Sequence, residues 1–209
     1  IGSDQSYDIT INIASDEEWS GFIRLDNNNS GIVVQNLNMN SSNSDSNLSR
    51  GAGWFFSKNA GGGGQINVNN CINNCNIISR ANSGGIFGIN AGWSGQSGSG
   101  NINITDCINN GNIQCEYGGG MIGGDRIGNI TITNCINNGN LLYGGYGGSY
   151  RGGIVGYFYT SQNLYINNCY NTGEIILSGG GIVGRSTGNV TIRGCYNTGI
   201  INTNGAGIT

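Results

Sequence analysis

A short pattern recurs five times in this chain and limits its fold more than any other feature. One copy reads NITITNCINNGNL from Asn129 to Leu141. Each copy is marked by one cysteine, at spacings of 36, 28, 34 and 26 residues: Cys71, Cys107, Cys135, Cys169 and Cys195. A repeat of this length is typical of solenoids and propellers.

The residues around each cysteine follow fixed rules. The positions five and three before it are aliphatic, as in Ile130 and Ile132, and their neighbours are mostly polar. This period of two predicts a strand with one buried face. An asparagine stands two residues after each cysteine, and Asn and Gly tolerate positive φ, so the Asn-x-Gly step predicts a corner. Stacking in register would also place these asparagines in a structural ladder, beside ladders of isoleucine and cysteine: Asn73, Asn109, Asn137, Asn171 and Asn197.

A second motif of the type G-G-I-V-G follows each cysteine motif from Cys71 to Cys169, first at Gly84. Each repeat thus supplies two or three short strands and no helix signal. Because one such unit cannot bury its own apolar face, the units must stack. We predict an all-β fold, a right-handed parallel β-helix of about five to six coils. A β-propeller is disfavoured, since its blades take about 40–50 residues.

The first 50 residues do not fit the repeat. They contain three stretches with strand character, at residues 7–14, 19–25 and 32–39. We predict an irregular N-terminal β segment over residues 1–50, acting as a cap or as the first coils. The repeat solenoid is predicted over residues 51–209.

The pairing of N-C-Y-N-T-G with G-G-I-V-G resembles the GLUG-motif repeats of bacterial surface and adhesin-like proteins. The resemblance covers about residues 50–209 and is best near Asn168–Gly184 and Gly194–Thr209. It implies an extracellular, repetitive β domain. Such repeats serve as stalks and scaffolds in many contexts, so the resemblance speaks for architecture more than for function.

Composition argues against several classes of function. A net charge of −3 disfavours a nucleic-acid surface, and no apolar run is long enough for membrane insertion. The chain has no histidine, and the carboxylates of the middle repeats do not occupy equivalent positions of the repeat. We therefore expect no enzyme activity and no cofactor. The start at Ile1 leads us to expect a lost leader peptide or a fragment.

Seven cysteines are present, and five of them occupy the repeat slot. We predict that these five form a column of buried thiols, because cysteine behaves as a small apolar residue. The remaining two, Cys75 and Cys115, are the best candidates for a disulfide. A metal site is disfavoured, since Cys71 and Cys75 form the one close pair and no histidine or second pair joins them.

Asparagine followed two residues later by Ser or Thr marks candidate glycosylation sites. Six occur: Asn28, Asn40, Asn47, Asn103, Asn129 and Asn189. The last three are predicted on the outward side of their strands. Attached sugar would require a glycosylating source.

The ends of a β-helix expose unpaired strand edges, which recruit other strands. We hypothesise that the last coil pairs with the N-terminal strand of another subunit, giving a head-to-tail homopolymer. The expected assembly edges are Tyr7, Ile9, Ile11, Ile13 and Ile208. A fragment of a longer solenoid and a capped monomer are the alternatives.

The favoured function is therefore an extracellular structural β-solenoid that forms a filament, stalk or adhesive fibre. The alternative is a carbohydrate-binding or carbohydrate-cleaving module of a larger surface protein. Its support is a set of loop aromatics that could stack on sugars: Trp93, Tyr117, Tyr143, Tyr146, Tyr150, Tyr157 and Tyr159. Ice binding is a third option, suggested by Thr131 and Thr133, but no threonine array repeats across the coils.

Overall fold

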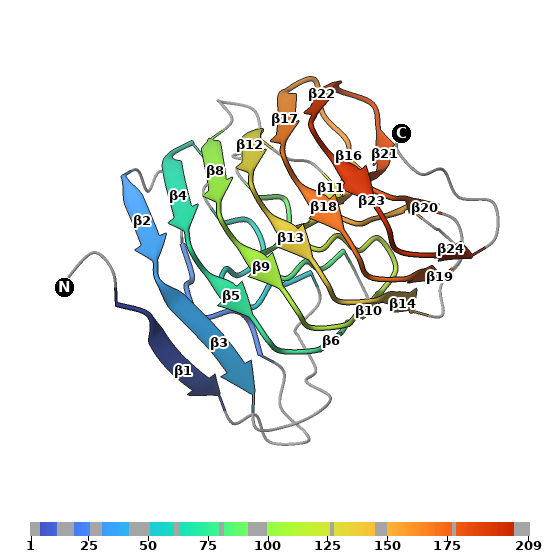
Figure 1. Ribbon diagram of the computed structural model, residues 1–209. Coiled ribbons are helices and arrows are strands. Elements are labelled where there is room, and N and C mark those ends of the chain that lie inside the picture. Colours follow the sequence, from blue (N-terminus) through green and yellow to red (C-terminus); the bar gives the residue numbers. More distant parts are fainter. Residues whose placement is uncertain are drawn as a thin grey trace.

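The chain forms a β-solenoid in which parallel strands stack coil upon coil (Figure 1). The computed structural model describes residues 5–11, 19–25, 31–41, 51–60, 63–79, 82–91, 100–125, 128–144, 150–176 and 179–202. All strand pairs within this described part are parallel, and it contains no helix. Consequently, none of its elements is a helix that could cross a membrane. The predicted all-β solenoid is confirmed.

Two long sheets run from the first coils to the last. The six-stranded sheet contains, in order, β2 (Ile32–Gln35), β4 (Gln65–Asn69), β8 (Asn101–Thr105), β12 (Asn129–Thr133), β17 (Asn163–Asn167) and β22 (Asn189–Arg193). The seven-stranded sheet contains β1 (Tyr7–Ile11), β3 (Leu37–Ser41), β5 (Ile72–Asn73), β9 (Ile108–Asn109), β13 (Ile136–Asn137), β18 (Tyr170–Asn171) and β23 (Tyr196–Asn197). Figure 1 shows both as ladders that progress from blue to red.

Three shorter sheets complete the coils. The first holds β6 (Ile77–Ile78), β10 (Ile113–Cys115), β14 (Leu141–Tyr143), β19 (Ile175–Ile176) and β24 (Ile201–Asn202). The second, formed by the glycine motif and the residues after it, holds β7 (Phe87–Ile89), β11 (Ile122–Asp125), β16 (Val155–Phe158) and β21 (Val183–Ser186). The third pairs β15 (Arg151–Gly152) with β20 (Gly179–Gly180).

The apolar slots read from the sequence form the core. In β12, Ile130 and Ile132 are buried while Asn129, Thr131 and Thr133 are only partly so. The same alternation occurs in β4, β8 and β17. Exact pairing between successive coils places like residues in columns, which buries the aliphatic side chains without any second layer of structure.

Each coil turns at the Asn-x-Gly step, as predicted, and also at the residue just before the cysteine. Bends at the glycine of this step separate the short strands of the seven-stranded sheet from those of the five-stranded sheet, at Gly111, Gly139, Gly173 and Gly199. Of these two turns, positive φ occurs only at the other one, at Asn70, Asp106, Asn134, Asn168 and Gly194. The asparagine two residues after the cysteine lies in a short strand with its side chain buried. The predicted corner is therefore confirmed, while the expectation of positive φ there was wrong.

The inward asparagines form one hydrogen-bonded column through the core. The amide nitrogen of Asn109 donates to Oδ1 of Asn137 at 2.7 Å, and Asn137 donates in turn to Asn171 at 2.6 Å. The same nitrogen also donates to a backbone carbonyl in its own coil, as from Asn137 to Gly139 at 2.8 Å. Each buried amide is thereby satisfied by its own coil and its neighbours.

The glycine four residues after the cysteine is required by close packing. A Cβ added at Gly139 would lie 1.9 Å from the carbonyl oxygen of Gly111 in the preceding coil. The same clash occurs at Gly111, Gly173 and Gly199. These glycines therefore let successive backbones approach at the point where the asparagine amides hydrogen-bond.

The first 50 residues contribute coils of the same solenoid. β2 and β3 pair with β4 and β5 in the two long sheets. The strand expected over residues 32–39 is broken by Asn36, whose φ is 59°, so it forms two strands around a corner. Over residues 19–25, bridge pairing is found at Trp19 and Ile23 in place of a full strand.

Replacing Asn137 by alanine tests the asparagine column. The change leaves one N–H of Asn109 without its acceptor, and the carbonyl of Gly139 and Oδ1 of Asn171 without this donor, all in the core. We expect the free energy of unfolding to fall by about 3–9 kcal/mol, since each of these three groups costs roughly 1–3 kcal/mol. Chemical denaturation followed by circular dichroism measures this.

The matched control is Asn138→Ala in the neighbouring position. Asn138 also donates to an asparagine of the previous coil, Asn110, but it does so at the exposed surface. Its loss should cost less than about 1 kcal/mol. Equal losses for the two variants would contradict a structural role of the buried column.

Candidate functional site

The five repeat cysteines form a second column beside the asparagines. The backbone nitrogen of Cys107 lies 3.4 Å from the sulfur of Cys135, and that of Cys135 lies 3.4 Å from the sulfur of Cys169. All seven cysteines are free, and six are buried. Cys195, in the last coil, is half-buried. The structure thus places the predicted thiol column in the core.

The predicted disulfide between Cys75 and Cys115 is not formed. Cys75 occupies the slot that holds glycine in later coils, and its carbonyl faces Gly111. Cys115 lies in another sheet, where its sulfur contacts the carbonyl of Ser83 at 3.7 Å. Although the two residues lie in adjacent coils, they stand at different positions around the coil, so the stack does not bring them together.

Burial suppresses the reactivity of the two thiols outside the column, Cys75 and Cys115. Burial raises the pKa of Cys75 to about 12 and that of Cys115 to about 11. Because the thiolate is the reactive form, both groups are poor nucleophiles at neutral pH. Within the described residues, no three Cys, Asp or Glu side chains gather in a way that could hold a metal ion.

The described sequon asparagines take part in surface hydrogen bonds. Asn103 donates to Asn67 at 2.9 Å, and Asn189 donates to Asn163 at 3.3 Å. Asn129 and Asn40 accept hydrogen bonds through their side-chain oxygens. All four are at least partly exposed, so glycosylation there stays a prediction. Asn28 and Asn47 lie outside the described residues.

Sequence reasoning missed a buried arginine. The guanidinium of Arg151 is fully buried and donates to three backbone carbonyls, those of Leu142, Ile176 and Cys115, at 3.0–3.3 Å. These carbonyls come from three successive coils, so Arg151 ties them together. Burial lowers the pKa of Arg151, whose high ordinary value still leaves it charged at neutral pH. An isolated arginine in a glycine-rich stretch gives no sequence signal for this role.

At the C-terminal end of the stack, no described strand pairs with the outer edges of β22 and β23. Leu164 and Ile166 are fully buried in β17, whereas the residues that follow them in the same columns, Val190 and Ile192 in β22, are half-exposed. Asn197, the last member of the buried asparagine column, is likewise only partly buried. The inner face of the last coil is therefore accessible.

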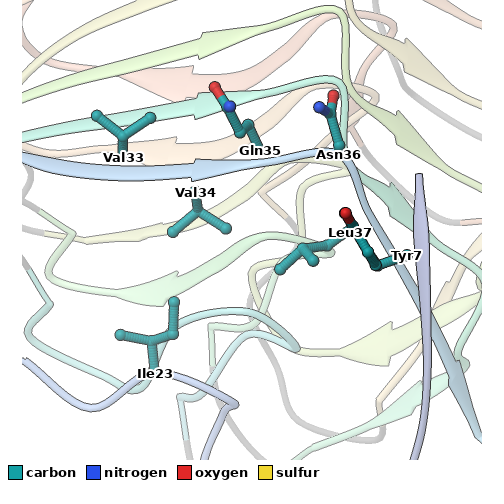
Figure 2. A pocket seen from close by; sticks show the side chains of 7 residues that line it. All are labelled: Tyr7, Ile23, Val33, Val34, Gln35, Asn36 and Leu37. Carbon is teal, nitrogen blue, oxygen red and sulfur yellow. The ribbon is translucent and has the colours of Figure 1, made fainter. Parts of the chain in front are cut away.

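The N-terminal end carries an apolar pocket of about 480 Å³. Its lining residues are Tyr7, Ile23, Val33, Val34, Gln35, Asn36 and Leu37. Figure 2 shows Val34 and Ile23 pointing toward each other across this space, with Leu37 beside them. The pocket lies along β2, the first strand of the six-stranded sheet, whose outer edge has no partner strand in the described residues.

The predicted assembly edges lie at this end. β1, with Tyr7, Ile9 and Ile11, is the first strand of the seven-stranded sheet, and one edge of it pairs with β3 of the same chain. Its other edge has no strand partner among the described residues. Ile13 and Ile208 lie outside the described residues.

Of the aromatic residues considered for sugar binding, the structure describes five. Tyr117, Tyr150, Tyr157 and Tyr159 come together in one cluster. Tyr143 lies apart, with its ring 5.7 Å from the guanidinium carbon of Arg151. Trp93 and Tyr146 lie outside the described residues.

Comparison with known proteins found no matching family model, no similar curated protein and no similar solved structure. The resemblance to GLUG-motif repeats therefore stays a prediction.

The buried thiols predict a loss of stability at high pH. The pKa of these thiols is 9.0 in the unfolded chain and about 11 or 12 in the folded chain, so their ionisation favours unfolding once the pH exceeds 9.0. We expect the contribution of Cys75 and Cys115 to the free energy of unfolding to be constant below this value, so that the free energy falls between about pH 9 and 11. Denaturant titrations at several pH values measure the slope.

The comparison variant carries Cys75→Gly, which adopts the residue of later coils, and Cys115→Ala. Its free energy of unfolding should fall less steeply between pH 9 and 11 than that of the original chain. An unchanged slope would show that these two thiols do not titrate with unfolding.

Proposed function

We propose that this chain is an extracellular structural β-solenoid that assembles head to tail into a filament, stalk or adhesive fibre. The observation that carries the proposal is the open C-terminal coil. Its inner slots are apolar, like those of every coil before it, yet Val190, Ile192 and Ile201 are half-exposed. Apolar side chains that remain exposed at the end of such columns favour association with another molecule.

The two ends of the molecule are compatible with each other. The seven-stranded sheet begins at β1 and ends at β23, and all its strands are parallel. A second copy placed along the axis would continue this sheet, with β1 beside β23. In the register of the other coils, Ile9 would face Asn197. A head-to-tail contact of this kind does not close on itself and gives a filament.

The pocket beside β2 marks a second part of the contact. The first coil contributes β1 to one long sheet but no described strand beside β2 in the other. The pocket is lined by Val34, which begins the column continued by Val68 in β4. We expect the assembled form to fill it with an extended segment whose aliphatic residues continue this column.

Charged substitutions at the C-terminal face test the proposal. The double variant Ile192→Lys, Ile201→Lys would place two ammonium groups in the contact. We expect association to weaken at least about 100-fold, because burying an unpaired charge costs several kcal/mol. The control is Ile200→Lys, since Ile200 is 66% exposed and adjacent to Ile201. Sedimentation velocity over a concentration series, with negative-stain electron microscopy, measures the assembly.

A mixing experiment tests the head-to-tail arrangement. The variant Ile9→Lys should have a blocked N-terminal edge and an intact C-terminal face, with Thr10→Lys as the outward-facing control. Mixed with the C-terminal double variant, it should form dimers and no fibres, since one functional end remains on each molecule. A protein that stays monomeric at all concentrations would refute assembly. Fibres in the mixture would refute this pairing of ends.

Thiol labelling gives an independent readout. Cys195 is half-buried in the isolated chain, while the other six cysteines are buried. Stacking should cover Cys195 as Cys169 is covered, so we expect its labelling rate to drop about 10-fold or more on assembly. An unchanged rate in fibres would place the contact elsewhere.

A further inference from the structure

Four tyrosine rings and one arginine gather on the surface of the middle and late coils. We call this set the tyrosine–arginine cluster: Tyr117, Tyr150, Tyr157, Tyr159 and Arg185. The ring centroids of Tyr117 and Tyr150 are 5.3 Å apart and nearly parallel, and those of Tyr157 and Tyr159 are 5.7 Å apart. Tyr157 is also within 5.9 Å of Tyr117 and 5.3 Å of Tyr150. The rings form one continuous aromatic surface.

The stacked coils position this surface. Tyr157 in β16 and Arg185 in β21 are direct partners in neighbouring coils. These two strands lie side by side near the C-terminal end of the solenoid (Figure 1). On the other side of Tyr157 its partner is Gly124, where an added Cβ would meet the backbone of Tyr157 at 2.3 Å. The column therefore has no side chain at Gly124.

Arg185 supplies a positive charge to the cluster, whose Tyr117 also donates a hydrogen bond to the carboxylate of Glu116. Its guanidinium lies 4.5 Å from the ring centroid of Tyr150 and 5.7 Å from that of Tyr157, and it donates to the hydroxyl of Tyr150. Arg185 is exposed and has no carboxylate partner among the described residues. Aromatic contacts hold the guanidinium in place while leaving its positive charge available to a ligand.

The combination of groups fits a particular ligand chemistry. Tyrosine rings pack against apolar C–H faces, and their hydroxyls donate and accept hydrogen bonds at the same surface. A guanidinium recognises a carboxylate through two parallel hydrogen bonds. A uronic acid polymer carries both features, sugar rings with hydroxyls and one carboxylate per residue. Nucleic acid is disfavoured, because the chain has a net charge of −3 and, of the residues that the structure describes, only Arg185 adds a cation to the cluster.

We propose that the tyrosine–arginine cluster binds acidic polysaccharide, with Arg185 holding a uronate carboxylate and the tyrosines contacting the sugar rings. Tyr159, which is 47% exposed, provides the most accessible ring. This binding function is separate from assembly through the ends, since the cluster lies on the lateral surface of the coils. A repetitive fibre would present the cluster many times and bind a polymer with increased avidity.

The test uses isothermal titration calorimetry of the intact chain with a hexamer of galacturonic acid. The neutral comparison ligand is cellohexaose, and the charged comparison ligand is poly-glutamate. We expect the acidic hexamer to bind, with affinity falling as salt is added. Arg185→Gln should weaken binding of the acidic hexamer about 10-fold or more, and Tyr159→Ala should weaken it to a similar degree.

The control variant is Tyr196→Ala, which removes an exposed tyrosine of another sheet that stacks on Tyr170 at 4.9 Å. It should bind the acidic hexamer as the original chain does. Thermal unfolding of each variant verifies that the fold is retained. Absence of binding by the acidic hexamer, or equal binding by Arg185→Gln, overturns the proposal. Equal binding of poly-glutamate overturns the assignment to sugar, since charge alone would then suffice.

Discussion

The buried asparagine column is the interaction on which the rest of the solenoid depends. Each amide, such as that of Asn137, hydrogen-bonds to the coil before, to its own coil and to the coil after. A shift of one residue between coils would break the two contacts to neighbouring coils inside the core, where unpaired polar groups are costly. The column therefore fixes the register of every coil while leaving the loops free to differ in length.

Two other features follow from that register. The thiol column lies two residues away from the asparagines, where a small apolar side chain fits between coils. The glycines at Gly111 and Gly139 allow backbones to meet where the amides bond. Arg151 adds a bridge across three coils at the opposite part of the turn. Columns of identical groups thus run through the core beside large buried side chains such as Trp54 and Phe56.

The sequence repeat made much of the core predictable. Once the cysteines were aligned, the buried slots at Ile130 and Ile132 and the column at Asn137 followed from the period alone. The place of the corner after Asn137 also followed, but its backbone conformation did not, because positive φ occurs at Asn134 and not at Asn137. Asparagine is abundant on both sides of each cysteine, so the local pattern does not show which asparagine adopts positive φ.

The ends and the lateral surface were harder to anticipate for a different reason. The strand at Tyr7 has the character of any edge strand, so its pairing with β3 of its own chain could not be distinguished from pairing with another molecule. Arg185 and Tyr150 are 35 residues apart, and only the coil lengths determine that they meet. Contacts between coils that lie outside the repeated slots depend on loops, which the repeat does not constrain.

The coil geometry also has a mechanical meaning. The coil from Cys107 to Cys135 takes 28 residues yet advances the long axis by only one strand spacing, about 4.8 Å. Drawn out, the same residues span roughly 95 Å at about 3.4 Å each. Tension applied to the two ends would unfold the coils one after another. Each unfolded coil would be about twenty times longer than its height in the stack. A stack of this kind is short and stiff under small loads and becomes a long, energy-absorbing tether under large ones.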